Sequence, residues 1–374
     1  MTKRILSTLL ATALLAGSAT PGMAAEPAKL GIGLGLTGPL AFLSQQYLRG
    51  MRAAVETINA EGGVGGGRKL ELVERDHKGV PSEAVAVAKR FIEQDRVDIV
   101  DIDLPSTVAI AAQTVTKQAK MPHITGYGFA PGVVEQDNPY HFRVCTNAGL
   151  VASVLAAVVH RTPGNKTIAM LAPNDDYGRG AVKGLTAALE KLGGPNVVFA
   201  DYYERNQTDF TAVLLKMKSL NPDSLYIDVR WPASVTVLKQ MTELGIKKQL
   251  FGSVNFYNTK LVERAGDLLE GAYMSVAWAP VFTDSASKKF VDAYKRLHNE
   301  VPDDSASLGW TAALVAAAAL RAAGPGADGD AIRAALAKVQ VEAPQGVIKF
   351  GPENDARVPA HVLQFTGGAY RLGK

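Results

Sequence analysis

The sequence predicts an α/β fold made of two similar halves, each a parallel sheet covered by helices. Short apolar runs that suit buried strands alternate with amphipathic helical segments over most of the chain, and this alternation is typical of parallel sheets. The chain has 374 residues, and roughly 350 of them remain after a predicted leader, which favours two domains. The single cysteine, Cys145, excludes an internal disulfide and is expected to be a small buried hydrophobic residue.

The first half of the chain shows the alternation from its beginning. Strands are expected at 30–36, 69–73, 97–102 and 123–124, and helices at 46–59, 82–94 and 107–120. The second half repeats the pattern, with strands at 167–171, 197–200, 224–229 and 249–251, and helices at 180–192, 208–220 and 233–244. The repetition indicates a second lobe of the same construction.

The order of the elements changes after Gly271. A strand is expected at 273–278, followed by helices at 285–300, 307–323 and 330–339. Hairpin-like segments at 346–350 and 361–365 end the chain, with turn signals at Asn354-Asp355 and Gly367-Gly368.

Residues 1–25 have the layout of a secretory signal peptide. Lys3 and Arg4 precede an apolar run at 5–16, and small residues then lead to a cleavage point near Ala25. The apolar run is too short to span a bilayer, and a buried N-terminal helix is the alternative. No later stretch is expected to reach the roughly 20 apolar residues of a spanning helix, so the mature chain is predicted to be soluble.

The charge balance argues against a nucleic-acid partner. The formal net charge is +4, and the signal segment supplies two of these charges through its lysine and arginine. The remaining excess is small and evenly spread, whereas nucleic-acid-binding proteins concentrate basic residues on one face.

Two glycine-rich motifs resemble nucleotide-binding loops but fail in detail. Residues 33–38 fit the G-x-G-x-x-G pattern after a strand, yet Pro39 follows where a helix should already be running. Residues 62–67 lack the Gly-Lys-Ser/Thr that completes a phosphate loop and lead into a strand instead of a helix. Both are interpreted as turns, and no cofactor is predicted.

Enzyme motifs are also absent from the sequence. There is no G-x-S-x-G elbow and no H-E-x-x-H, and the six histidines lack metal-ligand spacing. His141 and Cys145 are close in sequence, but a catalytic pair requires a spatial arrangement that proximity alone does not show. We therefore predict a binding protein and not an enzyme, without a metal site.

Several stretches, in this order and spacing, resemble one known family. They are Thr37-Gly38-Pro39-Leu40, Arg49-Gly50, residues 58–64, Asp175 to Gly180 with Tyr177 inside it, and residues 208–211 before Asn221-Pro222-Asp223. Together they are similar to the periplasmic solute-binding proteins of branched-chain amino acid ABC importers, over essentially the whole mature length.

The resemblance implies a type I periplasmic binding fold with two Rossmann-like lobes and a ligand clamped between them. Three chain crossings are expected, near Cys145, Trp278 and Val358. The implied N-terminal lobe contains residues 26–145 and 279–357, and the C-terminal lobe contains 146–278 and 358–374. The resemblance also implies a monomeric periplasmic protein that delivers its ligand to the permease subunits of an importer.

The resemblance also implies a set of ligand-binding residues. Ser106 matches the position whose hydroxyl holds a ligand carboxylate, although a serine before a helix can equally be its N-cap. Tyr177 matches a residue that covers the ligand. The full predicted set is Leu43, Ser106, Tyr127, Gly128, Phe129, Tyr177, Arg230, Trp231, Val254 and Asn255.

One departure from the family bears on the ligand. Amino-acid binders place an acidic residue where this sequence has Val254, with Asn255 beside it. A buried ammonium group without a carboxylate partner costs several kcal/mol. Several aromatic residues lie in the candidate loops, so an aromatic or keto acid is favoured. An aliphatic amino acid is the alternative, with Asp228 or Asp103 as the substitute acid. A ligand-sensing subunit of a signalling receptor is the alternative of another class.

Overall fold

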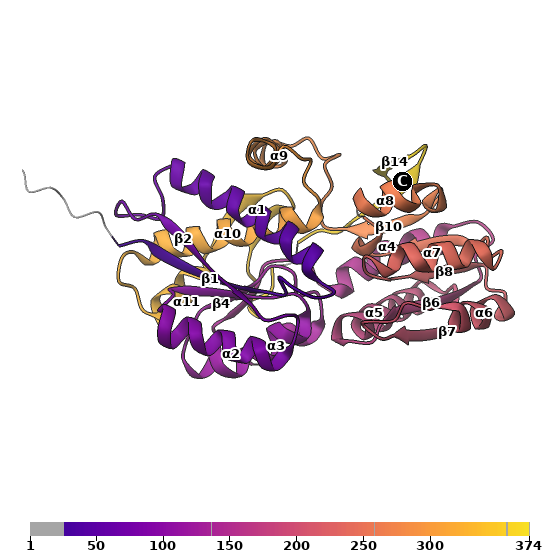
Figure 1. Ribbon diagram of the computed structural model, residues 1–374, viewed down its shortest axis with the longest axis horizontal. Helices are drawn as coiled ribbons and strands as arrows, with labels where there is room; N and C mark the ends of the chain where they lie inside the picture. The colour runs from indigo at the N-terminus through magenta and orange to yellow at the C-terminus, as the bar shows by residue number, and fades with distance from the viewer. Residues whose placement is uncertain (1–25, 136, 258, 357, 374) are drawn as a thin grey trace, which may run out of the picture.

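The computed structural model describes residues 26–135, 137–257, 259–356 and 358–373. The predicted signal peptide at 1–25 lies outside the described residues. Two separate sheets, each covered by helices, divide the chain into two lobes that lie side by side (Figure 1). The predicted α/β class with parallel sheets is confirmed.

The sheet of the N-terminal lobe has five parallel strands in the order β2-β1-β3-β4-β5. Its strands are β1 (Ala28–Leu34), β2 (Leu70–Asp76), β3 (Ile99–Ile102), β4 (His123–Thr125) and β5 (His141–Arg143). Figure 1 shows α1 (Ala41–Ala60) and α10 (Asp304–Ala323) on one side of this sheet, and α2 (Pro81–Arg90) and α3 (Ser106–Gln118) on the other. Helices cover both faces, so β1, β3, β4 and β5 are almost completely buried, whereas the edge strand β2 is only partly buried.

Later segments complete this lobe. They are α9 (Ser285–His298), α11 (Gly329–Leu336) and the antiparallel pair β11 (Gln340–Ala343) and β12 (Gly346–Lys349). The hairpin-like segment at 346–350 thus pairs with the strand before it. The turn signal at Asn354-Asp355 falls at a turn that brings Phe350 opposite Ala356 in an isolated antiparallel bridge, and Asp355 also bridges to Arg143.

The sheet of the C-terminal lobe has seven strands in the order β14-β13-β10-β9-β8-β6-β7. Its parallel strands are β6 (Thr167–Pro173), β7 (Asn196–Tyr203), β8 (Ser224–Ile227), β9 (Gln249–Gly252) and β10 (Tyr273–Val276). The antiparallel hairpin of β13 (His361–Thr366) and β14 (Ala369–Leu372) extends it beside β10. Its helices are α4 (Ala148–Arg161), α5 (Asp176–Leu192), α6 (Thr211–Leu220), α7 (Ala233–Glu243) and α8 (Thr259–Ala265).

Helix α10 is the central helix of the N-terminal lobe. Glycines bring it close to α1: a β-carbon at Gly50 would lie 1.8 Å from the Ala306 carbonyl oxygen, and one at Gly309 would lie 2.0 Å from the Tyr47 carbonyl oxygen. By length and composition α10 could cross a membrane, so the expectation that no later stretch is long and apolar enough is wrong. Because 72% of its apolar window is buried, α10 has the burial of a core helix.

Two of the three expected chain crossings lie beside a buried ion pair: the first link, near Cys145, and the third link, near Val358. Arg143 precedes the first link, and its guanidinium donates to both carboxylate oxygens of Asp355, which precedes the third link, at 2.8 and 2.7 Å. Cys145 lies in the first link as a fully buried free thiol, as predicted. Burial raises the pKa of this thiol. The lobe boundaries given above stay a prediction.

Candidate functional site

Loops that follow strands of both sheets enclose a cavity between the lobes. The N-terminal lobe contributes the loops after β1, β3 and β4, and the C-terminal lobe contributes the start of α5 and the loops after β8 and β9. About 330 Å³ of empty space lies there, counting the part that is open to solvent. It is lined by Leu40, Leu104, Pro105, Ser106, Tyr127, Phe129, Tyr177, Arg230, Val254 and Asn255. Strand ends of this kind are where open α/β sheets bind ligands.

Ser106 is the first residue of α3 and is almost completely buried. Its hydroxyl oxygen accepts a hydrogen bond from the amide of Ala130 at 3.3 Å, and it makes no cap to its own helix. The Ser106 hydroxyl oxygen is thus an acceptor for Ala130, and its proton is available to an acceptor atom of a ligand in the cavity. Together with the positive end of the α3 dipole, this hydroxyl suits a carboxylate.

The loop after β4 presents aromatic rings to the cavity. The loop approaches its neighbours closely, because a β-carbon at Gly126 would lie 2.0 Å from the Tyr47 hydroxyl and one at Gly128 would lie 2.3 Å from Thr125 Cγ2. Phe129 forms an edge-on ring pair with Tyr177 of the opposite lobe, with centroids 6.1 Å apart. The cavity therefore has an aromatic wall made by both lobes.

A buried aspartate organises the C-terminal side of the cavity. Asp228 follows β8, and its carboxylate accepts hydrogen bonds from four neutral side chains. The donors are the hydroxyls of Tyr177 (2.8 Å), Tyr226 (2.9 Å) and Ser253 (2.6 Å) and the amide nitrogen of Asn255 (2.5 Å). These four bonds use the capacity of a carboxylate, which has about four lone-pair sites.

Among the described residues that line the cavity, Arg230 is the only cation. Its Nη1 donates to Asp175 Oδ2 at 2.7 Å, and its guanidinium lies 5.2 Å from the centroid of the Tyr177 ring. Burial alone would raise the pKa of Asp175, but the charge and hydrogen bond of Arg230, together with the Gly178 amide and the Arg205 charge, lower this pKa below its usual value. Asp175 thus holds the guanidinium through Nη1, while other N–H groups of Arg230 remain for hydrogen bonds to a ligand.

The second candidate for a substitute acid, Asp103, is also engaged. Its carboxylate accepts hydrogen bonds from the amides of Leu104 and Tyr127, which hold the two cavity loops of the N-terminal lobe together. Burial raises its pKa to about 7, against the lowering effect of these amides. Asp103 therefore positions loops and does not itself line the cavity.

Seven of the ten predicted site residues line this cavity. The other three lie elsewhere. Leu43 packs in the core of the N-terminal lobe, and Gly128 lies behind the cavity wall, where its carbonyl faces Arg143. Trp231 packs against Phe42 across the lobes, with ring centroids 5.9 Å apart. Leu40, Leu104 and Pro105 also line the cavity but were not among the predicted site residues. Leu40 ends a quoted motif and the other two precede Ser106, but none of the three carries a polar signal.

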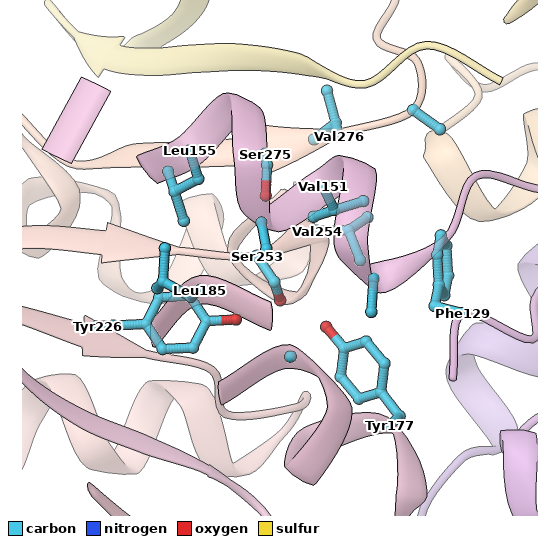
Figure 2. Close-up of a pocket in the computed structure, with 14 residues that line it drawn as sticks. Phe129, Val151, Leu155, Tyr177, Leu185, Tyr226, Ser253, Val254, Ser275 and Val276 are labelled. Carbon is cyan, nitrogen blue, oxygen red and sulfur yellow. The ribbon is translucent and has the colours of Figure 1, made fainter. Parts of the chain in front are cut away.

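A second cavity continues from the first into the C-terminal lobe. It has about 460 Å³ of empty space, counting the part that is open to solvent, and shares Phe129, Tyr177 and Val254 with the interlobe cavity. Figure 2 shows its labelled lining residues, most of them apolar, around the open space. Its remaining lining residues are Ala148, Val151, Ala152, Leu155, Ala181, Leu185, Tyr226, Ser253, Ser275, Val276 and Ala277.

The lobes also contact each other outside the cavities. Arg205 of the C-terminal lobe donates from Nη1 to the Gly79 carbonyl oxygen of the N-terminal lobe at 2.7 Å. With the Phe42–Trp231 contact, this bond bridges the lobes. Among the described residues, no group of three or more His, Cys, Asp or Glu side chains is placed to hold a metal ion.

Two mainly parallel sheets with a cavity between their strand ends define a two-lobed ligand-binding protein. The model of the family described as "Periplasmic binding protein" matches residues 27–368, and the chain belongs to this family. The predicted recognition is confirmed. Members of this family are solute-binding proteins, not enzymes, and the family name implies a periplasmic location.

Named relatives and solved structures support the family and the fold. The leucine-, isoleucine-, valine-, threonine- and alanine-binding protein of Pseudomonas aeruginosa is 27% identical over 94% of this chain and 93% of its own length. A leucine-binding protein of Thermotoga maritima is 24% identical, with a TM-score of 0.85 over 93% of this chain and 98% of that one. A solute-binding protein of R. palustris, solved in complex with benzoate, is 20% identical, with a TM-score of 0.85 over 92% and 95%. The last two similarities establish the type I fold.

Proposed function

We propose that this protein is the solute-binding component of an ABC importer and clamps a small carboxylate without an α-ammonium group between its lobes. The observation that carries the proposal is the charge of the cavity lining. The ten lining residues, all described, include one cation, Arg230, and no carboxylate. A ligand anion therefore finds a partner there, whereas a ligand ammonium finds none.

The carboxylate is assigned to the Ser106 side of the cavity. The Ser106 hydroxyl and the first amides of α3 form a donor set that matches a carboxylate, and Arg230 supplies charge from the opposite lobe. Contacts from both lobes to one anion favour the closed arrangement over an open one. The Phe129 and Tyr177 rings suit a flat apolar body.

An aliphatic amino acid is the second candidate, favoured by the name of the P. aeruginosa relative. It would require Asp228 to pair with the ammonium. All four donors to Asp228 are neutral, so an ammonium would have to displace at least one of them. The benzoate-bound relative has the same fold, so the fold does not require an amino acid.

Matched ligand pairs test the proposal. By isothermal titration calorimetry, 4-methyl-2-oxopentanoate is expected to bind at least about tenfold tighter than leucine, because they differ chiefly in the ammonium group. Benzoate is expected to bind and benzamide is not, because only the acid carries the charge. Leucine binding tightly while neither acid binds would overturn the ligand proposal and leave the transport role in place.

Ser106→Ala is expected to weaken acid binding by about 10- to 100-fold, the usual effect of losing one hydrogen bond to a charged group. Calorimetry with the tightest acid of the series measures it. Ser219→Ala is the matched control, because Ser219 is exposed on α6 and bonds only to its own helix. Equal affinities for Ser106→Ala and wild type would remove Ser106 from the site.

A further inference from the structure

We propose that the second cavity, inside the C-terminal lobe, is a subsite for an apolar extension of the ligand, and that the Ser275 hydroxyl binds a polar group on that extension. This inference rests on the proposed function and narrows it. The ligand class is a carboxylate whose ring or chain extends beyond a single benzene ring and ends in a hydroxyl or carbonyl.

The position of the subsite follows from its continuity with the carboxylate cavity. Phe129, Tyr177 and Val254 line both cavities. An anion held at Ser106 therefore projects its body past the Phe129 and Tyr177 rings, and the side cavity lies beyond them. Val254 forms part of the apolar passage between the two cavities.

The walls of the subsite are apolar and small. Helix α4 contributes Val151 and Leu155, helix α5 contributes Ala181 and Leu185, and β10 contributes Val276. Alanines in the wall leave the space open, because a larger residue at the same position would fill it. A cavity of this lining favours an apolar group that leaves water.

Ser275 is the exception in this wall. Its side chain is fully buried, and its hydroxyl has no hydrogen-bond partner. Figure 2 shows the Ser275 oxygen directed toward the open space between Leu155 and Val151. Buried hydroxyl groups are nearly always hydrogen-bonded in native proteins. The Ser275 hydroxyl is therefore expected to form a hydrogen bond with a polar group of the ligand.

The other hydroxyls of the subsite are already committed. Tyr177, Tyr226 and Ser253 all donate to Asp228. Of the described residues in this wall, Ser275 therefore holds the uncommitted donor. A single donor in an apolar cavity selects for one polar atom at one position of the ligand.

The subsite is tested with three acids of increasing reach: benzoate, 3-phenylpropanoate and 3-(4-hydroxyphenyl)propanoate. Calorimetry is expected to show tighter binding along this series in the wild-type protein. Ala181→Leu, which fills the subsite, is expected to weaken the two longer acids at least about tenfold and to change benzoate less than about twofold. Ala187→Leu, on the exposed face of the same helix, is the matched control.

Ser275→Ala separates the polar contact from the apolar space. It is expected to weaken 3-(4-hydroxyphenyl)propanoate about tenfold and to leave 3-phenylpropanoate unchanged. Because Ser275→Ala only removes an atom, this variant is expected to fold. It therefore tests the subsite even if Ala181→Leu fails to fold. A crystal structure with the hydroxylated acid is expected to place its hydroxyl at Ser275.

The outcomes distinguish this inference from the proposed function. If all three acids bind and each variant changes their affinities by the same factor, the subsite proposal is wrong and the proposed carboxylate site is retained. If no acid binds to the wild-type protein, the proposed function fails and the subsite with it. Selective loss of the longer acids supports both.

Discussion

Arg143→Met is expected to lower the free energy of unfolding by about 3–5 kcal/mol, because it leaves the Asp355 carboxylate charged and buried without its partner. The side chains of both residues are nearly inaccessible to solvent, and the pair is joined by two hydrogen bonds. Urea denaturation followed by circular dichroism measures the change. A loss below about 1 kcal/mol would show that this pair does not hold the linking segments.

The double variant Arg143→Met/Asp355→Leu controls for the effect of an unpaired charge. Replacing both members of a buried ion pair by apolar residues is often neutral. The double variant is therefore expected to recover most of the stability lost in the single variant. Its ligand affinity is expected to stay reduced, because Arg143 Nη1 also donates to the Ala130 carbonyl oxygen at 2.8 Å, in the loop that carries Phe129.

Asp228→Asn is expected to weaken acid binding by about 100-fold or more. The carboxylate accepts from four side chains, all of which line one or both of the two cavities. An asparagine amide offers one acceptor oxygen and turns an NH₂ group toward donors, so Tyr177 and Asn255 lose their positions. Calorimetry with 4-methyl-2-oxopentanoate measures the loss, and thermal unfolding confirms that the variant is folded.

The ligand dependence of this loss identifies the role of Asp228. Asp201→Asn, at an exposed aspartate on β7, is the matched control and is expected to bind like wild type. If Asp228 positions the cavity wall, leucine and the oxo acid lose affinity in similar proportion. A loss of affinity for leucine alone would instead identify Asp228 as the partner of the ligand ammonium and would support the amino-acid alternative.

Much of the fold could be predicted because it depends on local patterns. Apolar runs such as 167–171 and amphipathic segments such as 233–244 formed strand and helix almost where expected, since burial on one or both faces imposes their periodicity. Helix α4 was not predicted, although Asn147 caps it through the Leu150 amide and an apolar run follows. That omission concealed one wall of the second cavity.

Part of the candidate site was also accessible from the sequence. Residues after parallel strands gather at one sheet edge, so Ser106, Phe129, Tyr177 and Val254 were correctly expected to come together. Trp231 was placed in the same loop as Arg230, but its ring turned to Phe42. The direction of a side chain in a loop depends on packing partners that lie far away in the sequence.

The sequence by itself determined the α/β class, the two-lobed organisation expected from the family resemblance, and most of the loops that meet at the cavity. Only the tertiary structure decided which charges are free to meet a ligand. In the sequence, Asp228, Asp103 and Arg230 are equally good candidates for a charged partner of the ligand. In the structure, the carboxylates of Asp228 and Asp103 accept hydrogen bonds from other groups of the protein, and Arg230 is paired through Nη1 with Asp175. The physical reason is that the hydrogen-bond partners of a buried polar group determine whether it can also bind a ligand. Those partners come from residues such as Asn255 and Tyr177, which only the folded chain brings to Asp228.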